Sequence, residues 1–298
     1  MHTPAFAGVF ILYNLIMTVI FVLIALIIIV FCVKLYKALN WQQPPLKVFP
    51  KDLGFEAENI TFQNSDGITL KGWFVPCKNS SKTLVLMHGF EMDKSQILPQ
   101  TINLAKKYNL FYFDFRGMGE SSGKSAQGLR EYLDAKSALE YLRKNKPGQC
   151  KEISLYGISL GASVAAYIAA TDKTIKAVIL EACFYSYKRV VRKWAWNHHT
   201  LPYYPIVYIF LRFKRLKFRT GLEDLSPKTT APLIECPVLQ IHGKKDSLVS
   251  YKRALRVFDS LKHTKEFWLV ENAGHIRCHE IAGPKYLQEI SKFLTKYF

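Results

Sequence analysis

The chain has 298 residues, of which 49% are hydrophobic and 14% are aromatic. This composition excludes a mainly disordered chain and supplies enough apolar side chains for a sizeable core. The formal net charge of +18 indicates a polyanionic neighbour, either nucleic acid or anionic lipid headgroups.

The first element is an uncharged apolar run from Ala7 to Val33. As a helix it would be about 40 Å long, which exceeds the ~30 Å hydrocarbon core of a bilayer. No lysine or arginine precedes the run, and it is about twice as long as the apolar part of a signal peptide. We therefore predict an uncleaved transmembrane anchor over residues 1–36.

The charges that flank this anchor predict its orientation. Four lysines follow the apolar run and none precedes it: Lys34, Lys37, Lys47 and Lys51. The positive-inside rule then places the N-terminus outside and the rest of the chain on the cytoplasmic side. Six scattered cysteines without a C-x-x-C pair agree with a reducing compartment. For an anchored chain we expect anionic lipid as the polyanion, and no nucleic acid, because no nucleic-acid-binding motif is present.

A proline-rich juxtamembrane linker over residues 37–51 leads into a domain predicted for residues 52–298. It opens with a hairpin, in which runs at 59–63 and 69–76 flank the turn residues Asp66-Gly67. Six further apolar runs follow, at 83–87, 110–115, 152–157, 177–183, 237–243 and 266–272. They alternate with helix-period segments such as 129–145 and 286–298. This alternation predicts a mostly parallel sheet that helices cover on both faces, with the antiparallel hairpin at one edge.

One interval, about 185–227, lacks a strand pattern. It contains nine lysines and arginines and many aromatic residues, with no acidic residue before Glu223. We predict a cap inserted over the strand ends, whose basic and aromatic side chains meet an anionic membrane surface. The alternative is an ordinary surface cap.

Three chemically reactive residues follow apolar runs at the edge of the sheet where function gathers in such folds: Ser159, Asp246 and His275. A serine hydroxyl becomes a nucleophile when a base removes its proton and a carboxylate orients that base. The chain order Ser, Asp, His is expected when the serine sits on a sharp strand-to-helix turn. We therefore predict Ser159 as nucleophile, Asp246 as acid and His275 as base.

Two glycines flank the serine, in the pattern Gly157-x-Ser159-x-Gly161. A strained turn at the serine leaves no room for larger side chains at these positions. The backbone N–H groups of Leu160 and Phe90 are predicted to form the oxyanion hole, the second from the loop after a His-Gly pair.

Other interpretations of these residues remain open at this point. Ser159 could be a helix N-cap, and Asp246 could be a turn carboxylate. His275 has Cys278 and His279 nearby, but the sequence lacks a second cluster at metal-ligand spacing. We expect no metal and no organic cofactor.

Five segments resemble, in order, the motifs of the α/β-hydrolase superfamily: "LVLMHGFEMDKS", "FDFRGMGESSG", "LYGISLGAS", "PVLQIHGKKDSLV" and "VENAGH". The chain is similar in particular to its membrane-anchored serine hydrolase branch, the group of Bem46 and the α/β-hydrolase domain-containing proteins 13 and 17. The resemblance extends from Ile60 to Phe298 and includes the single N-terminal anchor. It implies an α/β-hydrolase fold and a structural role beside the active site for Asp114 and Arg116. The chain departs from the group at Phe90-Glu91, where asparagine or glycine is common.

The function predicted from these features is that of a membrane-anchored serine hydrolase. It would cleave an ester or thioester of a hydrophobic acyl group, carried by a small molecule, a lipid or a lipidated protein, through an acyl-enzyme. A serine peptidase or aminopeptidase-like amide hydrolase is the alternative enzyme, because the same machinery serves amides. A non-catalytic membrane scaffold with a hydrolase fold is the alternative without turnover.

Overall fold

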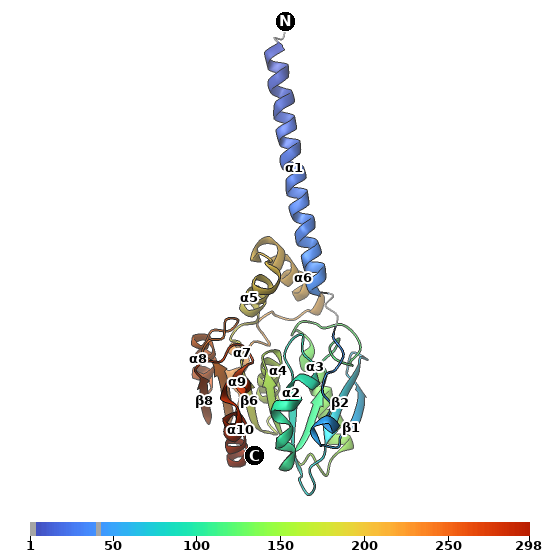
Figure 1. Ribbon diagram of the computed structural model, residues 1–298, viewed down its shortest axis with the longest axis vertical. Helices are drawn as coiled ribbons and strands as arrows, with labels where there is room; N and C mark the ends of the chain where they lie inside the picture. Colours follow the sequence, from blue (N-terminus) through green and yellow to red (C-terminus); the bar gives the residue numbers. More distant parts are fainter. Residues whose placement is uncertain (1–3, 40–42) are drawn as a thin grey trace.

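The structure, a computed structural model, describes residues 4–39 and 43–298. A long N-terminal helix projects from an α/β domain built on an eight-stranded sheet (Figure 1). The strand order is β1-β2-β4-β3-β5-β6-β7-β8. The strands are β1 Glu58–Gln63, β2 Thr69–Val75, β3 Lys82–Met87, β4 Asn109–Phe113, β5 Glu152–Ile158, β6 Ile175–Glu181, β7 Val238–Gly243 and β8 Lys265–Val270.

The pairing of the strands confirms the predicted sheet. β1 runs antiparallel to β2, and β2 runs antiparallel to β4, whereas all other neighbours are parallel. The β1–β2 hairpin therefore forms the antiparallel edge that its turn chemistry indicated. All five residues of β4 are buried, as an uninterrupted apolar run in the middle of a covered sheet requires.

Helices cover the two faces of the sheet and create a core on each. On one face lie α3 (Glu131–Asn145) and α4 (Leu160–Thr171), and on the other α2 (Lys94–Thr101) and α10 (Pro284–Tyr297). Adjacent residues of β3 alternate between the cores, because side chains of a strand point to opposite sides in turn. Val85 lies in the core with α3 and α4, and Leu84 and Leu86 lie in the core with α2 and α10.

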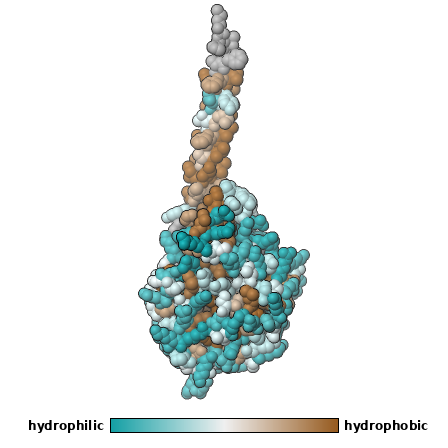
Figure 2. Space-filling view, turned by 180° about the vertical axis from the view of Figure 1, so that it is seen from behind, coloured by the Kyte–Doolittle hydropathy of each residue, from teal (hydrophilic) through white to brown (hydrophobic). Residues whose placement is uncertain are grey.

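The N-terminal helix α1 (Pro4–Leu39) contains one stretch, Gly8–Ala38, that is long and apolar enough to cross a membrane, with a mean hydropathy of 3.5. Figure 2 shows hydrophobic residues along much of this helix, above a largely hydrophilic domain surface. The helix continues past residue 36, where the sequence analysis placed the end of the anchor. Residues 40–42 of the predicted linker lie outside the described residues, and a 3₁₀ helix η1 (Pro50–Leu53) crosses its predicted end.

The interval 185–227 is helical and lies beside the domain end of α1 (Figure 1). It comprises α5 (Tyr187–His199), a π-helical turn η3 (Tyr203–Val207), α6 (Tyr208–Phe218) and the start of α7 (Pro227–Thr230). These helices, called the cap below, form a third apolar cluster that includes Phe31, Leu35 and Ala38 of α1. Lys34 of α1 also donates a hydrogen bond to Thr200 Oγ1 at 2.5 Å.

The remaining helices of the described residues are η2 (Ile102–Lys106), η4 (Ala231–Leu233), α8 (Tyr251–Ser260) and α9 (Cys278–Ala282). The first three lie between strands, and α9 follows β8, the last strand.

Candidate active site

Ser159 occupies a sharp turn between β5 and α4. Its φ of 52° and ψ of −106° form a strained conformation for a residue with a side chain. The turn is held by a 2.9 Å hydrogen bond from the Ser159 N–H to the carbonyl of Glu181 on β6. A Cβ atom on Gly161 would overlap the backbone oxygen of Met87, and one on Gly157 would overlap the backbone of Gly161. Close backbone packing therefore requires glycine at both positions.

The structure brings Ser159, His275 and Asp246 together from three separate loops. Ser159 Oγ lies 3.0 Å from His275 Nε2, and His275 Nδ1 lies 2.7 Å from Asp246 Oδ2. This geometry corresponds to an Nδ1–H that donates to the carboxylate, which leaves Nε2 free to accept the serine proton. The Asp246 side chain is fully buried, and its other oxygen accepts the N–H groups of Leu248 and Val249 at 2.9 and 2.7 Å.

A second histidine, which the sequence analysis did not single out, lies beside this acid. His242 Nε2 is 3.5 Å from Asp246 Oδ2 and donates to the Val249 carbonyl at 2.8 Å. Burial lowers the pKa of His242, although the Asp246 charge opposes that shift. The neutral ring does not compete as a cation for Asp246, so the carboxylate stays available to His275.

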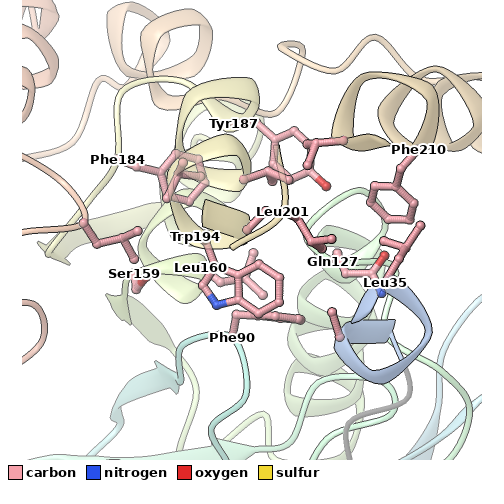
Figure 3. A pocket seen from close by; sticks show the side chains of 16 residues that line it. Leu35, Phe90, Gln127, Ser159, Leu160, Phe184, Tyr187, Trp194, Leu201 and Phe210 are labelled. Atoms are coloured by element: carbon pink, nitrogen blue, oxygen red, sulfur yellow. The ribbon is translucent and has the colours of Figure 1, made fainter. Parts of the chain in front are cut away.

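The two predicted oxyanion donors lie in the same region (Figure 3). Leu160 is the first residue of α4, where a backbone N–H has no acceptor within the helix. The loop that carries Phe90 is fixed by His88, whose Nδ1–H donates to the Gly89 carbonyl at 2.7 Å and whose Nε2 accepts the Phe115 N–H at 3.1 Å. Burial lowers the pKa of His88, which favours the neutral ring that both bonds need.

Buried ion pairs stabilise the loops around the site. The fully buried Lys94 ammonium contacts Asp114 Oδ2 and Glu120 Oε2, each at 2.6 Å. Asp114 also accepts the Lys94 N–H at 2.8 Å, so the start of α2 is tied to the loop after β4. Arg116 contacts the buried Asp134 at 2.6 Å through one nitrogen, and its Nε lies 3.0 Å from the same carboxylate. These contacts are structural, as the resemblance implied for Asp114 and Arg116.

An apolar pocket opens beside Ser159 and encloses about 800 Å³ of empty space, its open mouth included. Its walls come from the loop that carries Phe90, from α4, the cap and α1, and from the loops that carry Phe184 and Leu248. The lining residues include Phe90, Leu160, Phe184, Tyr187, Val190, Val191, Trp194, Leu201, Val207 and Phe210, together with Leu35 and Ala38 of α1. The Phe90 and Trp194 rings meet edge to face at 5.4 Å between centroids. Figure 3 shows both rings in view between Ser159 and Leu35.

That side chains of the cap and α1 line a pocket was not predicted from the sequence. On α5, Tyr187, Val190, Val191, Trp194 and Ala195 recur at helical spacing, a pattern that signals an apolar face. The contribution of Leu35 and Ala38 has no such signal, because the helix before them is apolar on all sides and Lys34 and Lys37 alternate with them.

Glu91 is the acidic residue next to Phe90. It adopts a left-handed φ of 59°, and its carboxylate is hydrogen-bonded by the side chain of Trp194. Burial raises its pKa to about 7. At Phe90-Glu91 this chain departs from the group that it resembles. The loop therefore carries a carboxyl group whose pKa is near neutrality.

Cys278 and His279, which follow His275 in the sequence, make contacts away from Ser159 and Asp246. Cys278 is fully buried in the core with α2 and α10, and the His279 ring packs on Tyr286 at 6.0 Å. Within residues 4–39 and 43–298, no three histidine, cysteine, aspartate or glutamate side chains are grouped to hold a metal ion.

Comparison with known proteins extends these observations. Residues 78–208 match the hydrolase family described as serine aminopeptidase, S33. The uncharacterized protein YfhR of Escherichia coli K12 is 28% identical over 286 residues, which cover 92% of this chain and 93% of that protein. Human α/β hydrolase domain-containing protein 17B is 29% identical over 237 residues, 78% of this chain and 74% of that protein.

The solved structures point the same way. The esterase Pf2001 of Pyrococcus furiosus superposes with a TM-score of 0.72 at 25% identity, over 87% of this chain and 99% of the esterase. The relatives thus include an esterase and a serine aminopeptidase-type family, which supports hydrolysis as the class of reaction. Its sheet, its motifs and these relatives show that the chain belongs to the α/β-hydrolase superfamily and is similar to the group of α/β hydrolase domain-containing protein 17B.

Proposed function

We propose that the protein is a membrane-anchored serine hydrolase that cleaves the ester or thioester of a hydrophobic acyl group. The observation that carries the proposal is the hydrogen-bonded series Ser159, His275 and Asp246 at an apolar pocket. A serine activated in this way attacks acyl carbonyls, and an apolar pocket beside it accommodates the acyl chain.

In the first half of the reaction, Ser159 Oγ attacks the carbonyl carbon and its proton passes to His275 Nε2. The negative oxygen of the tetrahedral intermediate accepts the N–H groups of Leu160 and Phe90. The bond to the leaving oxygen or sulfur then breaks, and the leaving atom takes the proton from His275. Asp246 stabilises the imidazolium while it holds the proton.

In the second half, water attacks the acyl-enzyme. His275 takes one proton from the water, the new C–O bond forms, and the bond to Ser159 Oγ breaks as the proton returns to the serine. The products are a carboxylic acid and the original enzyme. No step draws on a metal or an organic cofactor.

The lining of the pocket favours an acyl substrate over an amino-terminal peptide. An aminopeptidase needs an anionic group to bind the free ammonium. In the described part of the chain, no aspartate or glutamate is among the residues that line the pocket. A scaffold without turnover has no use for a strained serine aligned with a base and an acid.

We further propose that α1 crosses the membrane and that the cap lies against its anionic surface. Large apolar side chains of α5 and α6 are exposed, among them Trp196, Ile209, Phe213 and Leu216 at 59, 61, 59 and 74%. Basic residues surround them along the same helices. Aromatic and aliphatic side chains enter the interface, and cations meet lipid phosphate, so an anionic bilayer is the proposed partner and nucleic acid is not.

Labelling with a fluorophosphonate tests the nucleophile. The full-length protein in neutral detergent is expected to be labelled, and Ser159→Ala is expected to lose the label. Ser163→Ala is the matched control, since this serine lies one turn along α4 and donates to the Leu225 carbonyl. Equal labelling of Ser159→Ala and the parent would show that the nucleophile is elsewhere.

Substrate class is tested with an acyl series. Long-chain esters and thioesters are expected to be hydrolysed at least about tenfold faster, by kcat/KM, than amides of the same chain and than acetyl esters. An aminoacyl amide that outperforms the long-chain esters would favour the aminopeptidase alternative.

A further inference from the structure

A second cavity lies against the apolar pocket and has the opposite chemistry. It is formed between α5 and the loop that leads into α8, and it encloses about 590 Å³ of empty space. Phe184, Val190 and Leu248 line both cavities, so these three side chains form the wall between them.

Four cations line this second cavity: Arg189, Arg192, Lys193 and Arg253. The first three follow the i, i+3, i+4 spacing that puts side chains on one face of α5, and Arg253 comes from the first turn of α8. In the described part of the chain, none of the four is within 4.0 Å of a carboxylate oxygen in an ion pair. Some cations elsewhere on the domain do form ion pairs, such as Arg143 with Asp172.

The electrostatics of Arg253 show that this charge is not neutralised from within the protein. Burial lowers its pKa, and repulsion from Arg189, Arg256 and Arg192 lowers it further. Backbone N–H groups at the start of α8 add to the positive potential. A multiply charged anion would relieve the repulsion, and guanidinium groups bind phosphate oxygens in pairs.

The position of the cavity assigns it to one part of the substrate. The leaving atom must receive its proton from His275 and therefore lies on the side of His275 and Asp246. The residues that follow Asp246, namely Leu248, Val249 and Ser250, line the basic cavity. Leu248 and Val249 also hold the Asp246 carboxylate through their N–H groups. The cavity thus adjoins the leaving-group side, and the apolar pocket takes the acyl chain.

We propose that the cavity between α5 and α8 binds a phosphate group on the alcohol or thiol part of the substrate, so that the protein prefers phosphate-bearing acyl esters or thioesters. This inference rests on the proposed function. The same chemistry could be supplied by a phosphate headgroup of a neighbouring bilayer lipid, and the experiment distinguishes the two sources.

The test compares an acylglycerol with its acylglycerol phosphate, which share one acyl chain and differ only in the phosphate. Full-length protein is assayed in micelles of neutral detergent and in phosphate-free buffer. The phosphorylated ester is expected to have a kcat/KM at least about tenfold higher, mainly through KM, because a remote ionic contact binds ground state and transition state alike. Inorganic phosphate is expected to inhibit hydrolysis of the phosphorylated ester competitively.

The ratio of kcat/KM for the phosphorylated ester over the neutral ester is the quantity compared between variants. The double variant Arg189→Gln/Arg253→Gln is expected to lower this ratio at least about fivefold. Its control is Lys144→Gln/Lys176→Gln, which removes two positive charges from exposed positions on α3 and β6. The control is expected to keep the parental ratio. An equal fall in both double variants would show that the overall positive field, and not the cavity, selects the anion.

Two further outcomes overturn the inference. A ratio near one in the parent protein means that the cavity does not bind a substrate phosphate. Vesicles of anionic ether lipid could instead raise the rate at which the neutral ester is hydrolysed. If that increase is lost in Arg189→Gln/Arg253→Gln, the cavity is assigned to a bilayer headgroup. In both cases Ser159-dependent hydrolysis of the neutral ester still supports the proposed function, whereas hydrolysis by Ser159→Ala would contradict that function itself.

Discussion

Ser159 is held in a strained backbone conformation by its neighbours and not by its own side chain. Strand β3 and helix α4 approach so closely that only glycine fits at position 161. The strain at Ser159 is therefore maintained by packing in the most buried part of the sheet, where a local change affects the whole core.

Gly161→Ala tests this packing. The added methyl group would overlap the backbone oxygens of Met87 and His88, which cannot rotate away as a side chain could. We expect the free energy of unfolding to fall by about 3 kcal/mol or more in urea denaturation. Gly148→Ala, where nothing lies within 4 Å of the new atom, is expected to stay within about 0.5 kcal/mol of the parent. Similar losses in both variants would contradict this account.

The raised pKa of Glu91 predicts that the stability of the protein depends on pH. Burial raises its pKa from 4.5 to about 7, so between these values the unfolded chain releases a proton that the folded chain retains. The free energy of unfolding contributed by this group therefore falls as the pH rises through that window, and it is constant above it. For a half-exposed side chain the fall is on the order of 1 kcal/mol.

Glu91→Gln is expected to remove this fall, so that the variant gains stability relative to the parent between pH 4.5 and pH 7. Urea denaturation across that range measures the difference. Glu140→Gln makes the same chemical change at an exposed position on α3 and is expected to follow the parent curve. A constant difference between Glu91→Gln and the parent would mean that Glu91 titrates normally in the folded protein.

Contacts that follow from chain order could be predicted, and contacts that follow from burial could not. The proximity of Ser159, Asp246 and His275 was predictable because each follows a strand in an order tied to one turn geometry, and they lie within hydrogen-bonding distance in the structure. Lys94 carries no such signal. A lysine is ordinarily exposed, and its complete burial follows from Asp114 and Glu120, which lie at least twenty residues further along the chain.

At the scale of elements, the strands were predictable because a covered parallel sheet demands continuous apolar runs, which stand out in the sequence. Helix α5 was seen only as part of an interval without strands. The junction between α1 and the cap was not predictable, since the uncharged run up to Val33 has no single apolar face that would indicate which side packs against protein. That junction is the part of the fold that brings α1 into the wall of the pocket.

Leu35→Trp tests whether α1 shapes the pocket. A larger side chain at this position shortens the space for an acyl chain, so the ratio of kcat/KM for long-chain over short-chain esters is expected to fall about tenfold or more. Val33→Trp on the same helix is the control, because Val33 is 49% exposed and does not line the pocket. Equal chain-length profiles for the two variants would show that α1 does not limit the pocket.

For the whole molecule, the apolar helix and the basic cap lie at one end of the domain (Figure 1), and both contribute side chains to the pocket. The four lysines that follow the apolar run favour a cytoplasmic domain, and an anionic cytoplasmic leaflet would attract the cap to the membrane. The pocket would then open beside the bilayer, where long acyl chains are concentrated.

Protease protection tests this orientation. When protease is added to intact cells, the hydrolase domain is expected to remain whole, and it is expected to be digested once the membrane is permeabilised. A variant with Lys34→Gln, Lys37→Gln, His2→Lys and Thr3→Lys carries its positive charge before the apolar helix and less of it after. We expect the domain of this variant to be accessible to protease in a measurable fraction of molecules in intact cells, because positive residues then precede the span. Digestion of the parent domain in intact cells would place the domain outside. In that case the basic cap would face the outer surface of the membrane, and its attraction to anionic lipid would depend on the composition of that leaflet.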